Sequence, residues 1–193
     1  MSKVHIFWDN SNIHYVGLNQ IVKVMEPEVN TKLFRTYFKG LLQLALNGRT
    51  SGKLYLAGSV PPKGDELWEH IKAQGIEVEL LKRTSDNKEN ANDVSIQASM
   101  LRTMMDNLGS GDTFVILTGD GARGVLGEGF LADLERAFKA GFKVELMAWE
   151  ASCNRYLKDF ALKSGTFSPL EDHYFEITFI EGGRRPLPLT LKP

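Results

Sequence analysis

The chain has 193 residues, of which 42% are hydrophobic and 24% are charged, and this composition is ordinary for a globular domain. Its single cysteine, Cys153, excludes an internal disulfide and a zinc site built from cysteines. The net charge of −1 argues against a strongly basic domain that binds duplex DNA, although a local basic track is compatible with it.

Short apolar runs alternate along the chain with segments of helical periodicity, which predict strands and helices respectively. The predicted strands cover residues 4–8, 53–57, 76–81, 113–117 and 143–149. The predicted helices cover residues 31–47, 64–74, 93–107, 130–140 and 152–162, with an irregular connection or lid at 19–30. Several runs are apolar on both faces, as in strands covered by helices on both sides. The pattern therefore predicts an α/β fold, a Rossmann-like three-layer sandwich with a mostly parallel central sheet.

The end of the chain has a different pattern. Residues 173–180 alternate as a strand does and predict an extra C-terminal edge strand. Residues 182–188 hold two glycines, two arginines and two prolines, and they cannot continue a sheet. We therefore expect one domain over residues 1–165 and a C-terminal extension over 166–193, with a strand and a tail rich in Pro and Arg.

Acidic residues stand where several of these elements meet the same edge of the sheet. Asp9 follows the first strand directly, with Asn12 three residues later, and Asp120 follows the strand at 113–117. Asp93 lies at the head of the predicted helix 93–107, which also begins at the carboxyl edge. Ligands of open α/β sheets bind at this edge. We therefore expect Asp9, Asp93 and Asp120 in one region.

A cluster of carboxylates is stable only if a cation or protons neutralise it. Oxygen ligands without Cys or His favour Mg²⁺ or Mn²⁺, and such an ion equips a site for phosphodiester hydrolysis. Each residue also has a purely structural interpretation. Asp93 or Asn12 could cap a helix, Asp9 could bind backbone amides, and Asp120 could be a turn residue.

These same segments resemble a known family. The elements are Asp9-x-x-Asn12 after a strand, Asp93 at the head of a helix, and Thr118-Gly119-Asp120 after another strand. With later segments that match in order, they resemble the NYN domain, a branch of the PIN-like nuclease superfamily, from residue 4 to residue 162. The resemblance implies a PIN-like sandwich and metal-dependent cleavage, by an endoribonuclease, of RNA or other single-stranded nucleic acid.

Carried onto this sequence, the resemblance implies that Asp9, Asp93 and Asp120 are catalytic residues that bind Mg²⁺ or Mn²⁺, and that Asn12 is a polar group that shapes the site. The sequence departs from the family at Ala122, where a fourth acid is usual, and residues 123–129 form an insertion. Glu128 in this insertion is our candidate for the missing catalytic carboxylate. The candidates for contacts with nucleic acid are Arg123, Lys82, Arg83 and Lys88.

Two other functions stay open. The chain could be a nucleic-acid-binding or protein-binding module with weak or no catalysis, because an acid has been lost. Residues 119–124 also fit the G-x-G-x-x-G pattern of dinucleotide-binding proteins, but the next predicted helix begins only at residue 130. A lone match of this kind is weak, so this function ranks last.

The remaining expectations concern partners and location. RNA or single-stranded nucleic acid is the expected partner, and a homodimer is considered. No apolar stretch is long enough to span a bilayer and the first residues lack a signal-peptide pattern, so we expect a cytoplasmic protein without membrane contact. Trp8 and Trp149 could stack on bases, but packing under helices is favoured. His14, close to Asp9 in sequence, could contact a phosphate.

Overall fold

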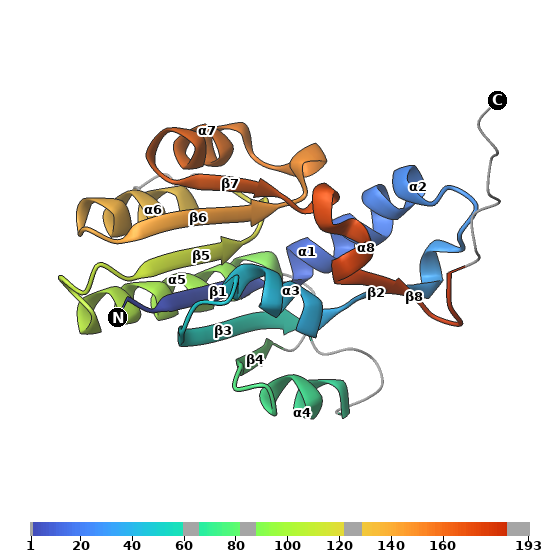
Figure 1. Cartoon of the computed structure of the whole chain (residues 1–193), viewed down its shortest axis with the longest axis horizontal. Helices are drawn as coiled ribbons and strands as arrows, with labels where there is room; N and C mark the ends of the chain where they lie inside the picture. The colour runs from blue at the N-terminus through green and yellow to red at the C-terminus, as the bar shows by residue number, and fades with distance from the viewer. Residues whose placement is uncertain (1, 60–65, 82–87, 122–128, 185–193) are drawn as a thin grey trace.

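The computed structural model describes residues 2–59, 66–81, 88–121 and 129–184. Within these residues, six parallel strands form a sheet in the order β4-β3-β1-β5-β6-β7 (Figure 1). They span Val4–Asp9 (β1), Ser51–Ser59 (β3), Glu77–Leu81 (β4), Thr113–Leu117 (β5), Lys143–Ala148 (β6) and Thr166–Pro169 (β7). Every residue of β1 and β5 is buried, as both faces of a covered parallel sheet require.

Helices pack on both faces of the sheet, so the fold has three layers. Alternate side chains of β1 enter opposite cores: Ile6 and Trp8 belong to one buried cluster and Phe7 to the other. The first cluster includes side chains of α1 (Asn10–Val16), α3 (Phe38–Leu46), α4 (Glu66–Lys72) and α8 (Tyr174–Ile177). The second includes side chains of α5 (Lys88–Asp106), α6 (Phe130–Lys139) and α7 (Arg155–Ser164). The predicted α/β three-layer sandwich is confirmed.

A small lobe extends beyond the carboxyl ends of the strands (Figure 1). Its two-stranded antiparallel sheet pairs β2 (Phe34–Thr36) with β8 (Thr178–Ile180). After α1, the chain continues through a π-helical turn (Gly17–Ile21), a short helix α2 (Val22–Met25) and a 3₁₀ turn (Thr31–Leu33). The lobe therefore stands beside the edge of the sheet where the predicted acids lie.

Three sequence predictions are wrong in this lobe and at the edge of the main sheet. The predicted helix 31–47 is interrupted by the strand at 34–36, because β2 pairs with a strand about 140 residues later, which local periodicity cannot reveal. The segment 19–30 is helical as far as Met25. Only residues 178–180 of the predicted edge strand are extended, and they pair with β2. The edge strand that does join the main sheet is β7, beside β6. The domain boundary at residue 165 stays a prediction.

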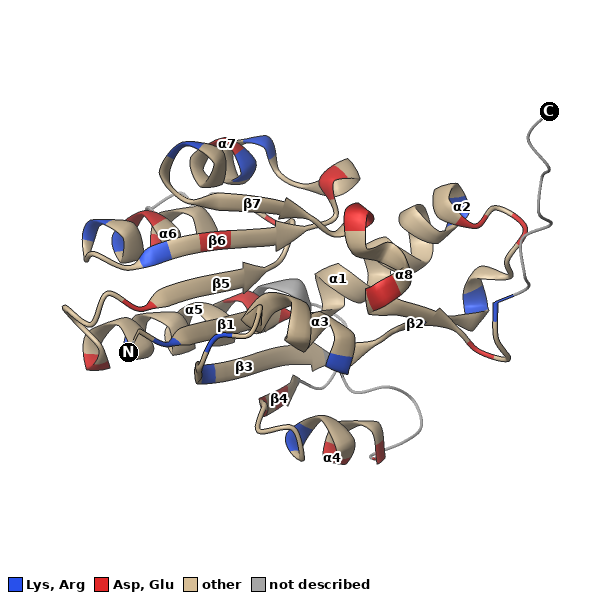
Figure 2. Cartoon of the chain, in the orientation of Figure 1, with Lys and Arg blue, Asp and Glu red and all other residues tan. Residues whose placement is uncertain are grey.

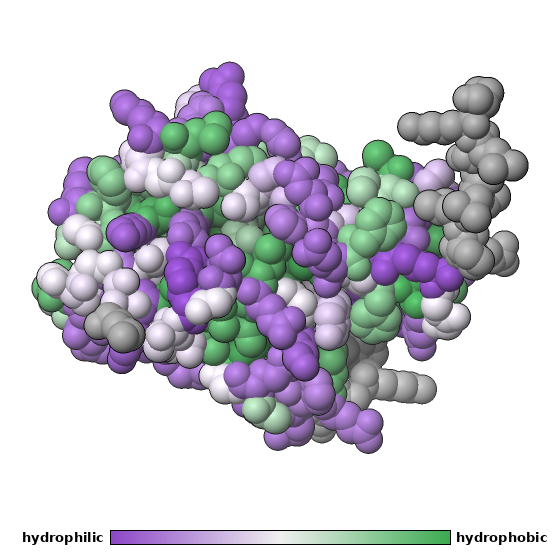
Figure 3. All heavy atoms as spheres, in the orientation of Figure 1, coloured by the Kyte–Doolittle hydropathy of each residue, from purple (hydrophilic) through white to green (hydrophobic). Residues whose placement is uncertain are grey.

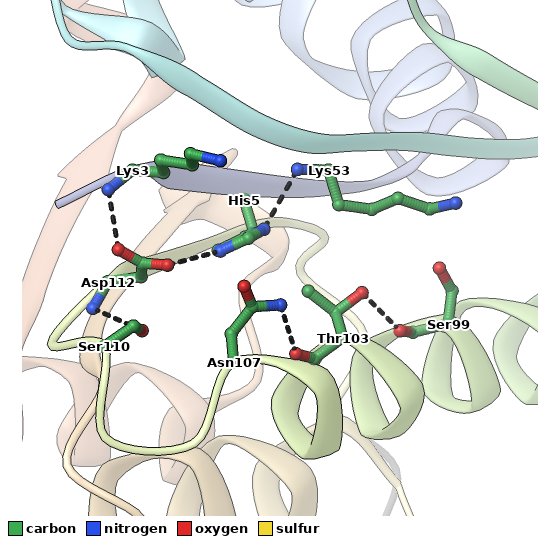
Figure 4. A network of polar contacts seen from close by, with 8 residues as sticks. All are labelled: Lys3, His5, Lys53, Ser99, Thr103, Asn107, Ser110 and Asp112. Carbon is green, nitrogen blue, oxygen red and sulfur yellow. Dashed lines mark hydrogen bonds and ion pairs between the residues drawn. The ribbon is translucent and has the colours of Figure 1, made fainter. Parts of the chain in front are cut away.

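A buried polar network ties the central strands together at their amino ends (Figure 4). His5 Nε2 lies 3.0 Å from Asp112 Oδ2, and Asp112 Oδ1 accepts the backbone N–H of Lys3 at 2.7 Å. His5 Nδ1 accepts the backbone N–H of Lys53 at 2.9 Å, so the proton of a neutral ring is on Nε2, toward Asp112. The network links β1 to β3 and to the start of β5, and its role is structural.

The surface carries both signs of charge without a large one-sided region in this view. Figure 2 shows Lys and Arg scattered among Asp and Glu over the helices, and Figure 3 shows polar and apolar side chains interspersed on the same face. The mixture of charges in Figure 2 agrees with the net charge of −1. Within the ranges listed above, no helix is long and apolar enough to cross a membrane.

Candidate active site

Asp9 is the last residue of β1 and the N-cap of α1. Its Oδ1 accepts the backbone N–H of Asn12 at 3.0 Å, and its Oδ2 accepts the hydroxyl of Thr118 at 3.2 Å. A cap of this kind satisfies an N–H group that has no partner inside the helix. The residue is only 5% exposed. Asp9 is thus fixed in position by the start of α1 and by the end of β5.

Burial makes the charged form of Asp9 unfavourable. Loss of solvent is the largest cause and raises the pKa of Asp9 to about 6, although the hydrogen bonds from Asn12 and Thr118 oppose it. The nearby carboxylate of Asp120 raises the pKa further. Two acids of this site therefore feel one another's charge, and a bound cation would relieve both the repulsion and the cost of burial.

Thr118 connects these two acids. It is completely buried, and its Oγ1 donates to Asp9 Oδ2 while accepting the backbone N–H of Asp120 at 3.2 Å. One hydroxyl thus sets the position of Asp120 relative to Asp9. Sequence reasoning gave Thr118 no role of its own. The available signal was its place between a buried strand and Gly119-Asp120, where a small side chain with both a donor and an acceptor is useful.

Asn12 holds the loop after β5. Its Oδ1 accepts the backbone N–H of Gly119 at 2.8 Å, so α1 and this loop are joined directly. A Cβ atom at Gly119 would lie 3.4 Å from that oxygen and from the carbonyl of Ser152, which is ordinary van der Waals contact. The interpretation of Asn12 as a helix cap is wrong, because Asp9 is the cap. Asn12 is a positioning residue.

The amino end of α7 closes the other side of the loop. The backbone N–H of Asn154 donates to the carbonyl of Gly119 at 2.8 Å. Its side-chain Oδ1 accepts the N–H groups of Tyr156 and Leu157, which caps α7. A Cβ atom at Gly121 would lie 2.7 Å from the side chain of Asn154, so a glycine is needed after Asp120. Asp120 itself is exposed between these two contacts.

Asp93 lies in the second turn of α5, which begins at Lys88, so it is not the helix N-cap. The preceding residue fixes this turn against α1, because Asn92 Nδ2 donates to Ser11 Oγ at 3.2 Å. Asn92 is 4% exposed, and its Oδ1 has no hydrogen-bond partner among the described residues. The structure therefore brings the turn that carries Asp93 to the helix that Asp9 caps. A role for Asp93 in metal binding stays a prediction.

The residues present fit a hard divalent cation held by few protein ligands. In the described part of the chain, no group of three or more His, Cys, Asp and Glu side chains is placed to hold a metal. Asp9 and Asp120 provide two interacting carboxylates, one buried and one exposed. Mg²⁺ is usually bound through one or two carboxylates together with water and substrate phosphates. The pair therefore fits such an ion, and the predicted three-acid group is not shown.

Several predicted site residues cannot be placed. Glu128, Arg123, Lys82, Arg83 and Ala122 lie outside the described residues, and Lys88 is described only as the first residue of α5, without its side chain. Their proposed roles stay predictions.

Trp8, Trp149 and His14 contact other parts of the protein. Trp8 and Trp149 are each 1% exposed, which confirms the prediction that they pack in the core and do not stack on bases. Trp149 Nε1 donates to the carbonyl of Ile13 at 2.8 Å and so anchors α1. His14 faces Thr36 Oγ1 at 3.1 Å and lies beside the ring of Phe34, and its pKa is lowered chiefly by burial and also by Arg35.

A groove runs along α5 toward the amino ends of the strands, where Lys3 and His5 line it. It has a volume of about 1030 Å³ and is lined by strand residues including Tyr55 and Glu79, and by α5 from Val94 to Asn107. It starts directly after Asp93 but does not include Asp9 or Asp120. Acidic and basic side chains both line it, so it is not a basic track.

A parallel sheet between two helical layers, with acids at the carboxyl ends of β1 and β5, is the arrangement of a PIN-like α/β domain. The family model for the NYN domain matches residues 3–164, so the chain belongs to the NYN domain family, within the PIN-like nuclease superfamily. The crystal structure of a protein of unknown function from Vibrio parahaemolyticus is similar, with a TM-score of 0.61 and 14% sequence identity. The similarity covers 92% of this chain and 96% of that one, and it supports the fold alone. No curated protein matches this sequence.

Proposed function

We propose that the protein is a metal-dependent nuclease that hydrolyses phosphodiester bonds in RNA or other single-stranded nucleic acid. The observation that carries this proposal is the pair of Asp9 and Asp120 at the carboxyl edge of an NYN domain, where the charge of Asp120 adds to the burial that raises the pKa of Asp9. Such a pair is unfavourable unless a cation is bound nearby.

In this proposal Asp9 and Asp120 hold Mg²⁺ or Mn²⁺, with Asp93 as a further ligand. When bound, the ion supplies a water of lowered pKa and stabilises charge on a phosphoryl oxygen. The chain's own contribution is rigidity. Thr118 and Asn12 accept the backbone N–H groups of Asp120 and Gly119 and so hold the start of the loop after β5, and the cap of α1 fixes Asp9.

The exposure of Asp120 and the burial of Asp9 suggest different tasks. Asp9 lies at the floor of the site, where the surrounding protein excludes water and strengthens its interaction with a cation. Asp120 faces solvent and can approach both the ion and the substrate phosphate. Glu128 and Arg123 stay candidates for a fourth acid and a phosphate contact.

The test is cleavage of a labelled single-stranded RNA by purified protein in Mn²⁺ or Mg²⁺. Asp9→Asn and Asp120→Asn should each abolish most of the activity, and EDTA should abolish all of it. Asp106→Asn is the matched control, because Asp106 is an exposed acid at the opposite end of α5. Cleavage that survives both site substitutions would refute the proposal.

A second candidate is a nucleic-acid-binding or protein-binding module without catalysis. The observation that favours it is the lack of a three-ligand acidic group among the residues that the structure describes. Retained RNA binding by the parent protein, with no cleavage in either metal, would support this candidate over the nuclease.

A further inference from the structure

Tyr15 is an exposed aromatic side chain on α1, the helix that Asp9 caps. It lies on α1, one turn after Ser11, and residues four apart share a face of a helix. Ser11 Oγ accepts from Asn92 on α5, so this face of α1 is turned toward the turn that carries Asp93. Tyr15 is 39% exposed, and its position is only about 9 Å along the helix axis from Asp9.

A second exposed aromatic lies at the start of α7, next to the loop that carries Asp120. Tyr156 is the second residue of α7 and is 51% exposed. Its backbone N–H is bound by Asn154, the residue that packs against Gly121 directly after Asp120. The guanidinium carbon of Arg155 lies 5.2 Å from the centre of the Tyr156 ring. This site therefore combines an aromatic face with an exposed positive charge.

Both rings stand on well-fixed backbone. The first turn of α1 is capped by Asp9, and the carbonyl of Ile13 is bound by the Trp149 indole. The first turn of α7 is capped by Asn154, which also binds the loop after β5. An exposed ring on a rigid backbone loses little conformational entropy when a flat ligand stacks on it. By contrast, all three tryptophans are buried and cannot serve this purpose.

We infer that Tyr15 and Tyr156 are stacking platforms for bases on either side of the scissile phosphate, and that Arg155 contacts the adjacent backbone phosphate. The inference deepens the proposed function and rests on it. Stacking on aromatic rings accepts any base, because every base has a flat face, and it needs bases that are not already paired and stacked in a duplex. The substrate would therefore be single-stranded and bound with little sequence preference.

The first experiment measures binding of a fluorescein-labelled, single-stranded RNA of mixed sequence in EDTA, which prevents cleavage. Tyr15→Ala and Tyr156→Ala should each raise the Kd at least about fivefold, as the loss of one stacked base does. Phe138→Ala is the matched control, because Phe138 is 45% exposed but lies near the end of α6, at the opposite edge of the sheet. The Kd of Phe138→Ala for the single strand should equal that of the parent protein. For a duplex of the same sequence, the Kd of every variant should equal that of the parent.

The second experiment detects stacking directly and does not depend on an alanine variant folding well. Tyr15→Trp and Tyr156→Trp each add an exposed indole to a protein whose own tryptophans are buried. Single-stranded RNA should quench the added fluorescence of both, and Phe138→Trp should not respond. The inference would be overturned if RNA left the fluorescence of both Trp variants unchanged and both Ala variants kept the Kd of the parent. It would also be overturned if the parent protein bound no single-stranded RNA.

These outcomes separate the inference from the proposed function. Binding with the expected effects, but no cleavage in Mn²⁺, would support the stacking platforms and refute the nuclease. Cleavage that depends on Asp9 and Asp120 but not on either tyrosine would support the nuclease and refute the platforms.

Discussion

Replacement of Asp9 by Asn should stabilise the metal-free protein above pH 6 and leave its stability nearly unchanged below pH 4. Folding raises the pKa of Asp9 from its ordinary value of 3.8 to about 6, chiefly through burial. The native state therefore binds this proton more tightly than the unfolded chain does. Stability of the parent protein should fall as pH rises from 4 to 6, and the loss persists at higher pH.

The magnitude follows from the two pKa values. One pKa unit corresponds to about 1.4 kcal/mol, so the burial of charged Asp9 costs at most roughly 3 kcal/mol at pH 8. Asn keeps the cap of α1, since it is as good an N-cap as Asp, and it can still bond Thr118. Most of that cost should therefore be recovered, which for a chain of this size is a rise in Tm of up to about 6–12 °C.

The assay is urea unfolding of the parent and the Asp9→Asn variant in EDTA, at a series of pH values from 4 to 8. Asp106→Asn controls for the loss of one exposed negative charge. A variant that is less stable than the parent at pH 8 would refute the reasoning. A difference in the free energy of unfolding between variant and parent that is the same at pH 4 and pH 8 would also refute it. With Mn²⁺ present the gap between parent and variant should narrow, because a bound cation favours the carboxylate.

Three further substitutions test the contacts that hold the fold and the site. Asp112→Ala removes the acceptor of both His5 and the Lys3 backbone, and should lower the free energy of unfolding by about 1–3 kcal/mol in urea titrations. Asn154→Ala removes the cap of α7 and should cost about 1 kcal/mol in the same measurement. Gly121→Ala places a Cβ atom against the Asn154 side chain and should cost about 1–3 kcal/mol; it should also lower the rate of RNA cleavage.

Each of these expectations has an outcome that contradicts it. Asp112→Asn keeps an acceptor oxygen, so a loss of stability equal to that of Asp112→Ala would show that the hydrogen bonds are not what matters. Asn154→Ser also caps a helix and should restore the stability that alanine loses. A Gly121→Ala variant with unchanged Tm and cleavage would mean that the loop and α7 adjust freely to one another.

Patterns within single elements could be predicted from the sequence. The strands β1 and β5 were predicted correctly because burial on both faces makes most of their residues apolar, with Ile6, Phe7 and Trp8 in a row in the first. The placement of Asp9 and Asp120 near one another also followed, since parallel strands bring their carboxyl ends to one edge. The NYN resemblance likewise placed residues 4–162 in the correct fold.

Contacts between distant segments could not be predicted. The three-residue strand β2 has no readable period of its own and is extended only because β8 pairs with it. The role of the Thr118 hydroxyl became visible only when β1 and the loop after β5 were placed side by side. The roles of Asn154 and Tyr156 became visible only when α7 was placed against the same loop.

The sequence by itself thus determined the layers, the edge of the sheet that carries the acids, and the family. Only the tertiary structure decided the charge state of Asp9, because its pKa depends on how much water the folded protein removes and on the distance to Asp120. Local periodicity reports which residues are apolar, whereas a site is made by the relative positions of groups from β1, α1, β5, α5 and α7. Those positions result from packing, which no single segment of the chain encodes.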